Sequence, residues 1–187
     1  MAWGPPAPPF PAYGPPPPWG PGAPWTPPPR DDYAGWGRRV AGLVIDHAPS
    51  YVALVVLYAG YLPTYLGFFR RELNVPPSYW LVLIGTLLSL GAFGWSVYNR
   101  YFLAGRSGQS VGKRVTKTWL VSQTTGRPIG PFNAFLRDLL HIVDGFGYVG
   151  YLWPLWDDEH QTLADKLAQT IVVRTPVPPL TDLERRG

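Results

Sequence analysis

Two long apolar stretches separated by a short polar break dominate the hydropathy pattern of the chain. They run over residues 40–62 and 79–103, and each is long enough to cross a bilayer as a helix. The polar break between them contains Arg70, Arg71, Glu72 and the pair Pro76-Pro77. The pattern therefore predicts two transmembrane helices joined by a short loop. A kink is expected at Pro49 in the first helix, and close helix contact in the second at Gly85, Gly91 and Gly94.

A third apolar stretch covers residues 132–156. Its first part, 132–144, is predicted to be an amphipathic helix, followed by a break at 145–147 and a short aromatic segment that ends at residue 156. Arg137, His141 and Asp144 fall at positions i, i+4 and i+7, which places one polar stripe on an otherwise apolar helix. Such a stripe is more typical of an interfacial or re-entrant helix than of a lipid-exposed one. The length of the stretch also permits one plain crossing, so both alternatives stay open.

Two strand candidates flank this third stretch. The first contains Val115, Thr118, Trp119, Leu120 and Val121 and precedes a Thr-Thr-Gly turn, and the second covers residues 170–173. If the two strands pair, both ends of the third stretch lie on the same side of the membrane. The predicted fold class is an α-helical membrane protein with two transmembrane helices, a third apolar segment that crosses or re-enters, and a small cytoplasmic two-stranded β element.

An arginine followed seven residues later by an aspartate occurs twice, as Arg39 to Asp46 and as Arg137 to Asp144. Seven residues are two helical turns, so each Arg is expected at a membrane surface with its Asp about 10 Å deeper on the same helix face. Ionisable groups at that depth point to function by default. The alternative is that each Asp ties helices together or pairs with an Arg of a neighbouring helix.

Residues 1–30 hold more than half of the 24 prolines, with Trp, Phe and Tyr between them. A segment of this composition cannot bury a core, so residues 1–33 are predicted to be a disordered cytoplasmic tail. It serves either as a docking segment or as a flexible spacer. The membrane domain is then expected over 34–174, and a polar C-terminal tail over 175–187.

The basic residues indicate an orientation in the membrane. One side would hold Arg38, Arg39, Arg106, Lys113, Arg114, Lys117 and Arg127, and the other only Arg70 and Arg71. By the positive-inside rule, the N-terminus and residues 104–133 are expected to be cytoplasmic. The net charge of +4 is explained by this arrangement, so no nucleic-acid partner is expected. Lys113 and Arg114 are placed to meet anionic lipid headgroups.

The residues that carry most enzyme chemistry are missing or wrongly spaced. The chain has no cysteine, its three histidines lack a metal-ligand spacing, and no serine lies in a nucleophile elbow. The G-x-G-x-x-G pattern at 145–150 follows a predicted helix instead of a strand, which favours close packing or a backbone break over a dinucleotide site. We expect no enzyme, no cofactor and no metal.

Four ordered motifs nevertheless resemble one known family. They are Arg39-x-x-Gly-x-x-x-Asp46, Gly108-Gln-Ser-Val-Gly-Lys-Arg114, Arg137-Asp-Leu-Leu-His-Ile-Val-Asp144, and the run from Gln161 through Leu-Ala-Asp-Lys to Val173. Together they resemble the RDD family of bacterial membrane proteins, which is named for one arginine and two aspartates. The family residues carry over to Arg39 and Asp46, and to Asp144 with Asp165 as its competitor. One departure is Gln169, where the family more often has Gly.

The resemblance implies a multi-pass protein of the bacterial plasma membrane. Members are usually described as involved in transport of unidentified ligands, with cation/proton exchange suggested for some, and the Pro-rich tail resembles that of actinobacterial proline-rich membrane antigens. Two functions follow. In one, Asp46 and Asp144 meet and exchange a proton for a cation, with His47 and His141 as relays. In the other, the chain is a non-catalytic scaffold or accessory subunit whose tail recruits partners, as a homo-oligomer or with other membrane proteins.

Overall fold

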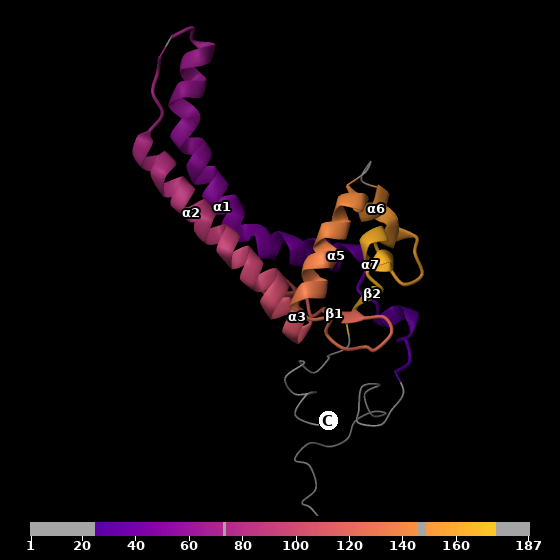
Figure 1. The fold of residues 1–187 in the computed structure, drawn as a ribbon. Coiled ribbons are helices and arrows are strands. Elements are labelled where there is room, and N and C mark those ends of the chain that lie inside the picture. The colour runs from indigo at the N-terminus through magenta and orange to yellow at the C-terminus, as the bar shows by residue number, and fades with distance from the viewer. Residues whose placement is uncertain (1–24, 73, 146–148, 175–187) are drawn as a thin grey trace, which may run out of the picture.

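The computed structural model describes residues 25–72, 74–145 and 149–174. A long helical hairpin, α1 and α2, carries a small domain at one end (Figure 1). That domain contains α4 to α7 and the two strands. It packs against one end of the hairpin, where the N-terminal end of α1 lies beside the C-terminal continuation of α2.

The hairpin consists of α1 (Trp36–Phe69) and α2 (Tyr79–Val97), and α2 runs on through a π-helical segment, η2 (Tyr98–Leu103), into α3 (Ala104–Ser107). Within the described residues these are the two helices long and apolar enough to cross a membrane, as predicted. In the most apolar 18-residue stretch of each helix, only 17% and 11% of the residues are buried inside the protein. Most of their apolar side chains therefore face outward. The 34 residues of α1 extend over roughly 51 Å, which exceeds the roughly 30 Å of a hydrocarbon core.

Close contact between α1 and α2 depends on glycine at two positions. A Cβ atom added to Gly85 would lie 2.6 Å from the Leu57 Cα atom, and one added to Gly60 would lie 2.8 Å from the Val82 backbone nitrogen. Gly85 therefore has the predicted role. Among the residues that the structure describes, nothing lies within 4 Å of a Cβ atom added to Gly91 or Gly94, so the predicted close contact was wrong for those two. The helix α1 bends along its length in Figure 1, and Pro49 and Pro63 lie inside it.

The predicted strand pairing is confirmed. Strands β1 (Trp119–Ser122) and β2 (Thr170–Val173) are antiparallel, with Trp119 opposite Val173. The first strand begins later than the sequence suggested, because residues before it form a short helix, α4 (Val111–Val115), capped by the Ser110 side chain. Gln169 adopts a φ of 50°, so the turn before β2 keeps the left-handed conformation that glycine favours.

Two residues that the sequence assigned to the tail, Trp25 and Tyr33, pack on this sheet. A 3-10 turn, η1 (Arg30–Asp32), leads to Tyr33, which forms a β-bridge with Val173 and is buried with Val121 and Ile171. Trp25 packs against the same cluster and its Nε1 donates a hydrogen bond to the Gln123 carbonyl over 2.8 Å. The folded region thus begins earlier than residue 34, because these two aromatic side chains cover one face of the sheet. The rest of the predicted tail, 1–24, and the C-terminal tail, 175–187, lie outside the described residues.

The segment between the strands leaves the sheet and returns to it. It contains α5 (Pro131–Asp144), α6 (Val149–Leu152), a 3-10 turn η3 (Trp153–Leu155) and α7 (Leu163–Leu167). The helix α5 extends over roughly 21 Å, too short to cross a hydrocarbon core by itself. It is amphipathic as predicted: Arg137 and Asp144 are buried, whereas Phe132, Phe135, Leu139 and Ile142 are exposed.

Candidate functional site: a buried network of arginines and aspartates

Asp165 lies at the centre of a buried ionic cluster. Arg39 Nη1 reaches one carboxylate oxygen at 2.5 Å, and Arg137 reaches the other through Nε at 2.7 Å and Nη2 at 2.6 Å. Asp165 is fully buried and Arg137 nearly so. The cluster therefore joins α1, α5 and α7, three helices that are far apart in the sequence.

The local sequence around Asp165 explains why the carboxylate is fixed. Thr162 and Asp165 form a capping box at the start of α7, in which each side chain accepts a hydrogen bond from the other residue's backbone N–H. The Thr170 hydroxyl donates a further bond to Asp165. Burial raises the pKa of Asp165, but the charges of Arg137 and Arg39 outweigh it, and the pKa lies well below its usual range. The carboxylate is therefore ionised at neutral pH.

Arg137 is held in its charged form by the same cluster. Burial alone lowers its pKa, but Asp165 and Asp138 outweigh burial and raise it. Arg137 Nη1 lies 3.8 Å from Asp138, and Asp138 pairs with Arg100 of η2 at 2.6 Å. The network thus runs from α7 through α5 to the end of the second long helix. The sequence patterns considered above did not single out Asp138.

Asp46 lies at the centre of a second buried polar group. All of the donors in its described hydrogen bonds are neutral. Asn99 Nδ2 and the Gly112 N–H donate to one carboxylate oxygen at 2.7 Å each, and the Ser110 hydroxyl donates to the other at 2.5 Å. Asp46 is 5% exposed and Asn99 fully buried. These bonds join α1 to η2 and to α4. The sequence did contain a signal for Asn99, which is a polar residue inside the apolar stretch 79–103 and was not among the predicted site residues.

Close backbone approach makes this second group possible. A Cβ atom on Gly112 would collide with the Gly42 carbonyl oxygen of α1 and would lie 2.9 Å from the Asp46 carboxyl carbon. Gly112 is therefore required for its own N–H to reach the carboxylate. The G-x-x-x-D spacing from Gly42 to Asp46 and the Ser-Val-Gly run from Ser110 come together at this contact.

Asp144 forms a third group with His141. The two side chains meet at 2.5 Å, and Asp144 also accepts a hydrogen bond from the Ala164 N–H of α7 at 3.1 Å. Burial and the charge of Arg137 lower the pKa of His141, against the opposing effect of Asp165 and Asp144. A Cβ atom on Gly150 would collide with Asp144, so the last glycine of the G-x-G-x-x-G pattern serves close packing.

His47 has a defined tautomer. Its Nδ1 faces the Leu43 carbonyl oxygen at 2.8 Å, and its Nε2 faces Arg100 Nη1 at 2.8 Å. A carbonyl accepts only and a guanidinium donates only, so Nδ1 carries the proton and Nε2 accepts. The His47 ring is thus held between the Leu43 carbonyl and Arg100.

Lys113 and Arg114 differ although they are adjacent. Arg114 is exposed. Lys113 is half-buried, where the charges of Arg137, Asp46, Asp138 and Arg100 all act on it. Burial, followed by the charge of Arg137, lowers the pKa of Lys113 to about 8.

The arrangement differs from the predicted one in its pairing. Arg39 does not pair with Asp46 on its own helix but with Asp165, 126 residues away. Asp165 pairs with both arginines, whereas Asp144 pairs with His141. Asp46 and Asp144, which we had expected to meet, share no hydrogen-bond partner among the described residues. The described part of the chain also contains no cluster of His, Asp and Glu suited to a metal ion.

Comparison with known proteins supports a family assignment. The RDD family matches residues 33–169. A "Proline-rich antigen homolog" of Mycobacterium tuberculosis is 36% identical over 155 residues, and the "Proline-rich antigen" of Mycobacterium leprae is 31% identical over 167 residues. The matches cover 78% and 76% of this chain but only 65% and 61% of those relatives. No solved structure matches the chain. On the motifs, the two apolar helices and these matches, the chain belongs to the RDD family of membrane-type proteins.

Proposed function

We propose that the chain is a non-catalytic membrane scaffold. In this proposal the α1/α2 hairpin lies in the bacterial plasma membrane, the small domain is held at its cytoplasmic face, and the Pro-rich N-terminal segment recruits partners. The observation that carries the proposal is the pairing of one buried carboxylate, Asp165, with Arg39 and Arg137 from two separate helices.

The pairing of Asp165 with Arg39 and Arg137 is better suited to holding the helices together than to carrying protons. A carboxylate that exchanges protons near neutral pH needs a pKa near that pH, and the pKa of Asp165 is held well below its usual range. Removing one partner from a buried ion pair costs about 3–5 kcal/mol. Asp165 must therefore stay charged, and its role in this proposal is to fix the positions of α1, α5 and α7 relative to one another.

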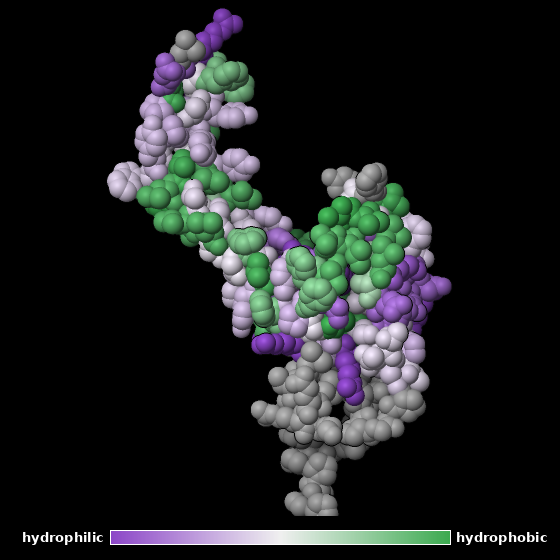
Figure 2. Space-filling model, in the orientation of Figure 1, coloured by the Kyte–Doolittle hydropathy of each residue, from purple (hydrophilic) through white to green (hydrophobic). Residues whose placement is uncertain are grey.

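The outer surface of the small domain supports its position against a bilayer. Figure 2 shows a continuous hydrophobic surface over the α5 and α6 region, beside the hairpin. The exposed apolar side chains of residues 131–156 include Phe132, Phe135, Leu139, Ile142, Val149, Leu152, Leu155 and Trp156. An amphipathic helix with such a face lies in the interface with its apolar side toward the acyl chains. The paired strands return both ends of this segment to one side, which supports the re-entrant or interfacial alternative over a third crossing.

Cation/proton exchange is the second candidate, and one observation favours it. Asp46 lies on a helix that is apolar enough to cross a membrane, and its described hydrogen bonds come from Asn99, Ser110 and Gly112. No ion pair to Asp46 occurs among the described residues. An unpaired carboxylate can change its protonation state without breaking a salt bridge. In this candidate Asp46 acts alone, because Asp144 belongs to a different group.

Purification of the intact assembly tests the scaffold proposal. The full chain and a chain lacking residues 1–24 would be extracted from the native membrane in lipid nanodiscs, and the stoichiometry measured by native mass spectrometry. The proposal predicts a partner protein, or further copies of this chain, bound at a fixed ratio to the full chain and lost from the shortened one. The same lone monomer from both chains would contradict it.

A further inference from the structure

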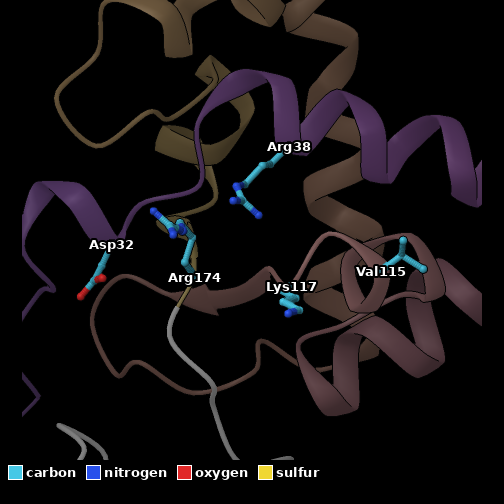
Figure 3. A pocket seen from close by; sticks show the side chains of 5 residues that line it. All are labelled: Asp32, Arg38, Val115, Lys117 and Arg174. Atoms are coloured by element: carbon cyan, nitrogen blue, oxygen red, sulfur yellow. The ribbon is translucent and has the colours of Figure 1, made fainter. Parts of the chain in front are cut away.

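An open cavity of about 590 Å³ lies beside the start of α1, apart from the Arg–Asp network. Its lining residues are Asp32, Arg38, Val115, Lys117 and Arg174, which come from η1, α1, the end of α4, the turn before β1 and the residue after β2 (Figure 3). Three of the five carry positive charge and one carries negative charge. The cavity therefore has a net charge of +2, from three cations less one carboxylate.

The two arginines are held in place by backbone acceptors, with no carboxylate among their described hydrogen bonds. Arg38 Nη1 donates to the Thr116 carbonyl at 3.2 Å, and Arg174 Nη1 donates to the Asp31 carbonyl at 3.4 Å. Each bond uses one of the five N–H donors of a guanidinium. Both arginine side chains line the same cavity, and in Figure 3 the Asp32 carboxylate points away from Arg38. Like charges gathered in this way favour an anion between them.

The walls of the cavity are tied together by the backbone. The Arg174 N–H donates to the Asp32 carbonyl at 2.7 Å, next to the bridge between Tyr33 and Val173. Lys117 occupies a turn with a φ of 52°, closed by a bond from its own N–H to Arg114 at 3.2 Å. The three cations are thus attached to a pre-formed frame, so a ligand would not have to order the backbone.

We propose that this cavity binds a phosphate group. Planar guanidinium groups recognise phosphate by paired N–H donors, and Lys117 adds a point charge. Arg38 lies in the first turn of α1, at the end of a helix that is apolar enough to cross a membrane, where lipid headgroups are found. The phosphate belongs either to an anionic lipid headgroup or to a free phosphate ion, and the experiment separates these sources.

Two charge-matched double variants of the full chain provide the test. The first, Arg38→Gln with Lys117→Gln, removes two cavity cations. The control, Arg114→Gln with Arg127→Gln, removes two exposed cations from the same end of the molecule that do not line the cavity. Both variants and the unmodified chain would first be compared in detergent without ligand, to establish that their melting temperatures agree. A third variant, Arg174→Gln, would stand in for the first if that one unfolded.

Binding would be measured in two arms. In one, inorganic phosphate is titrated against sodium chloride of equal ionic strength, and the rise in melting temperature is followed. In the other, phosphatidylglycerol is titrated into phosphatidylcholine nanodiscs, and bound lipid is counted by native mass spectrometry. We expect saturable binding in at least one arm, weakened about tenfold by the cavity variant and little changed by the control. A response in the first arm identifies free phosphate as sufficient, and a response in the second alone identifies a headgroup. No binding in either arm, or equal loss in both double variants, would overturn the proposal.

Discussion

Arg39 in the first turns of α1 and Asp165 in α7 form a buried ion pair with an Nη1 to Oδ2 distance of 2.5 Å. The pair joins the long hairpin to the small domain across 126 residues of sequence. Both charges are removed from water, so each stabilises the fold only while the other is present. This contact acts together with the Arg100–Asp138 pair and the hydrogen bonds of Asp46 to fix the relative position of the two parts of the molecule.

Replacing Asp165 with Asn should strongly destabilise the protein. The amide cannot neutralise Arg39 and Arg137, which would leave two buried cations without their shared carboxylate. We expect a loss of about 3–5 kcal/mol in the free energy of unfolding, measured by denaturant titration in detergent.

The matched control is Asp158→Asn. Asp158 pairs with Arg30 on the surface, where the two side chains are 86% and 64% exposed. Its replacement should change the free energy of unfolding by less than about 1 kcal/mol. Equal effects of the two substitutions would show that the buried network does not hold the fold together.

Lys113 should make stability depend on alkaline pH. Its pKa in the folded protein is about 8, below the ordinary value of 10.5, so below pH 8 the fold carries the full cost of a half-buried charge. As pH rises from about 8 to 10.5, the folded lysine has already lost its proton while the unfolded one still holds it, and this cost fades. Lys113→Met should therefore raise the melting temperature at pH 7, and the gain should shrink by pH 10.

Arg114→Met is the control for this effect, because Arg114 is exposed and keeps its charge throughout the range. Its melting temperature should run parallel to that of the unmodified chain from pH 7 to 10. A Lys113→Met protein that is less stable at pH 7, with no recovery at pH 10, would show that the lysine is favourably paired.

Gly112→Ala tests the contact between α4 and α1. The added methyl group would collide with the Gly42 carbonyl and press on Asp46, at a cost of about 1–3 kcal/mol. Gly91→Ala in α2 enters open space and should instead be neutral or stabilising by up to about 1 kcal/mol, because alanine favours the helix. Thermal melting of the two proteins compares them, and a Gly112→Ala protein as stable as Gly91→Ala would refute the close approach.

Trp25 tests where the folded region begins. Trp25→Ala removes a half-buried ring from the cluster of Tyr33, Val121 and Ile171, with an expected loss of about 2 kcal/mol in the free energy of unfolding. Trp25→Phe keeps most of the apolar area but loses the bond to the Gln123 carbonyl, so it should cost about 1 kcal/mol. An unchanged melting temperature in both would restore the original boundary of the tail at residue 33.

Local patterns in the sequence predicted the local features of the fold. Two apolar stretches became α1 and α2, the stripe of Arg137, His141 and Asp144 became an amphipathic helix, and the short apolar run at 170–173 became β2. These elements depend on neighbouring residues, whose spacing is visible in the chain. The first strand was placed too early because the cap at Ser110, which starts α4, was not recognised.

The long-range pairing was not predicted, for a physical reason. Spacing along one helix shows which residues share a face, but an ion pair such as Arg39 with Asp165 depends on how distant helices pack. The Thr162-x-x-Asp165 spacing did contain a usable signal, because it marks a capping box that fixes the carboxylate at a helix start. Lys113 is half-buried although its neighbour Arg114 is exposed, a difference that depends on the packing of α4 and that spacing along the chain does not predict.

The central claim, that the buried polar groups hold the structure instead of moving ions, is tested most directly at Asp46. Asp46→Asn should keep the fold, since the amide oxygen still accepts from Asn99 and Gly112 and the amide nitrogen can donate to Ser110. The unmodified chain and this variant would be reconstituted in liposomes, and proton-coupled cation flux measured with their melting temperatures. The account predicts flux no greater than in protein-free liposomes for both. Flux in the unmodified chain that a stable Asp46→Asn protein abolishes would contradict it and establish exchange through Asp46.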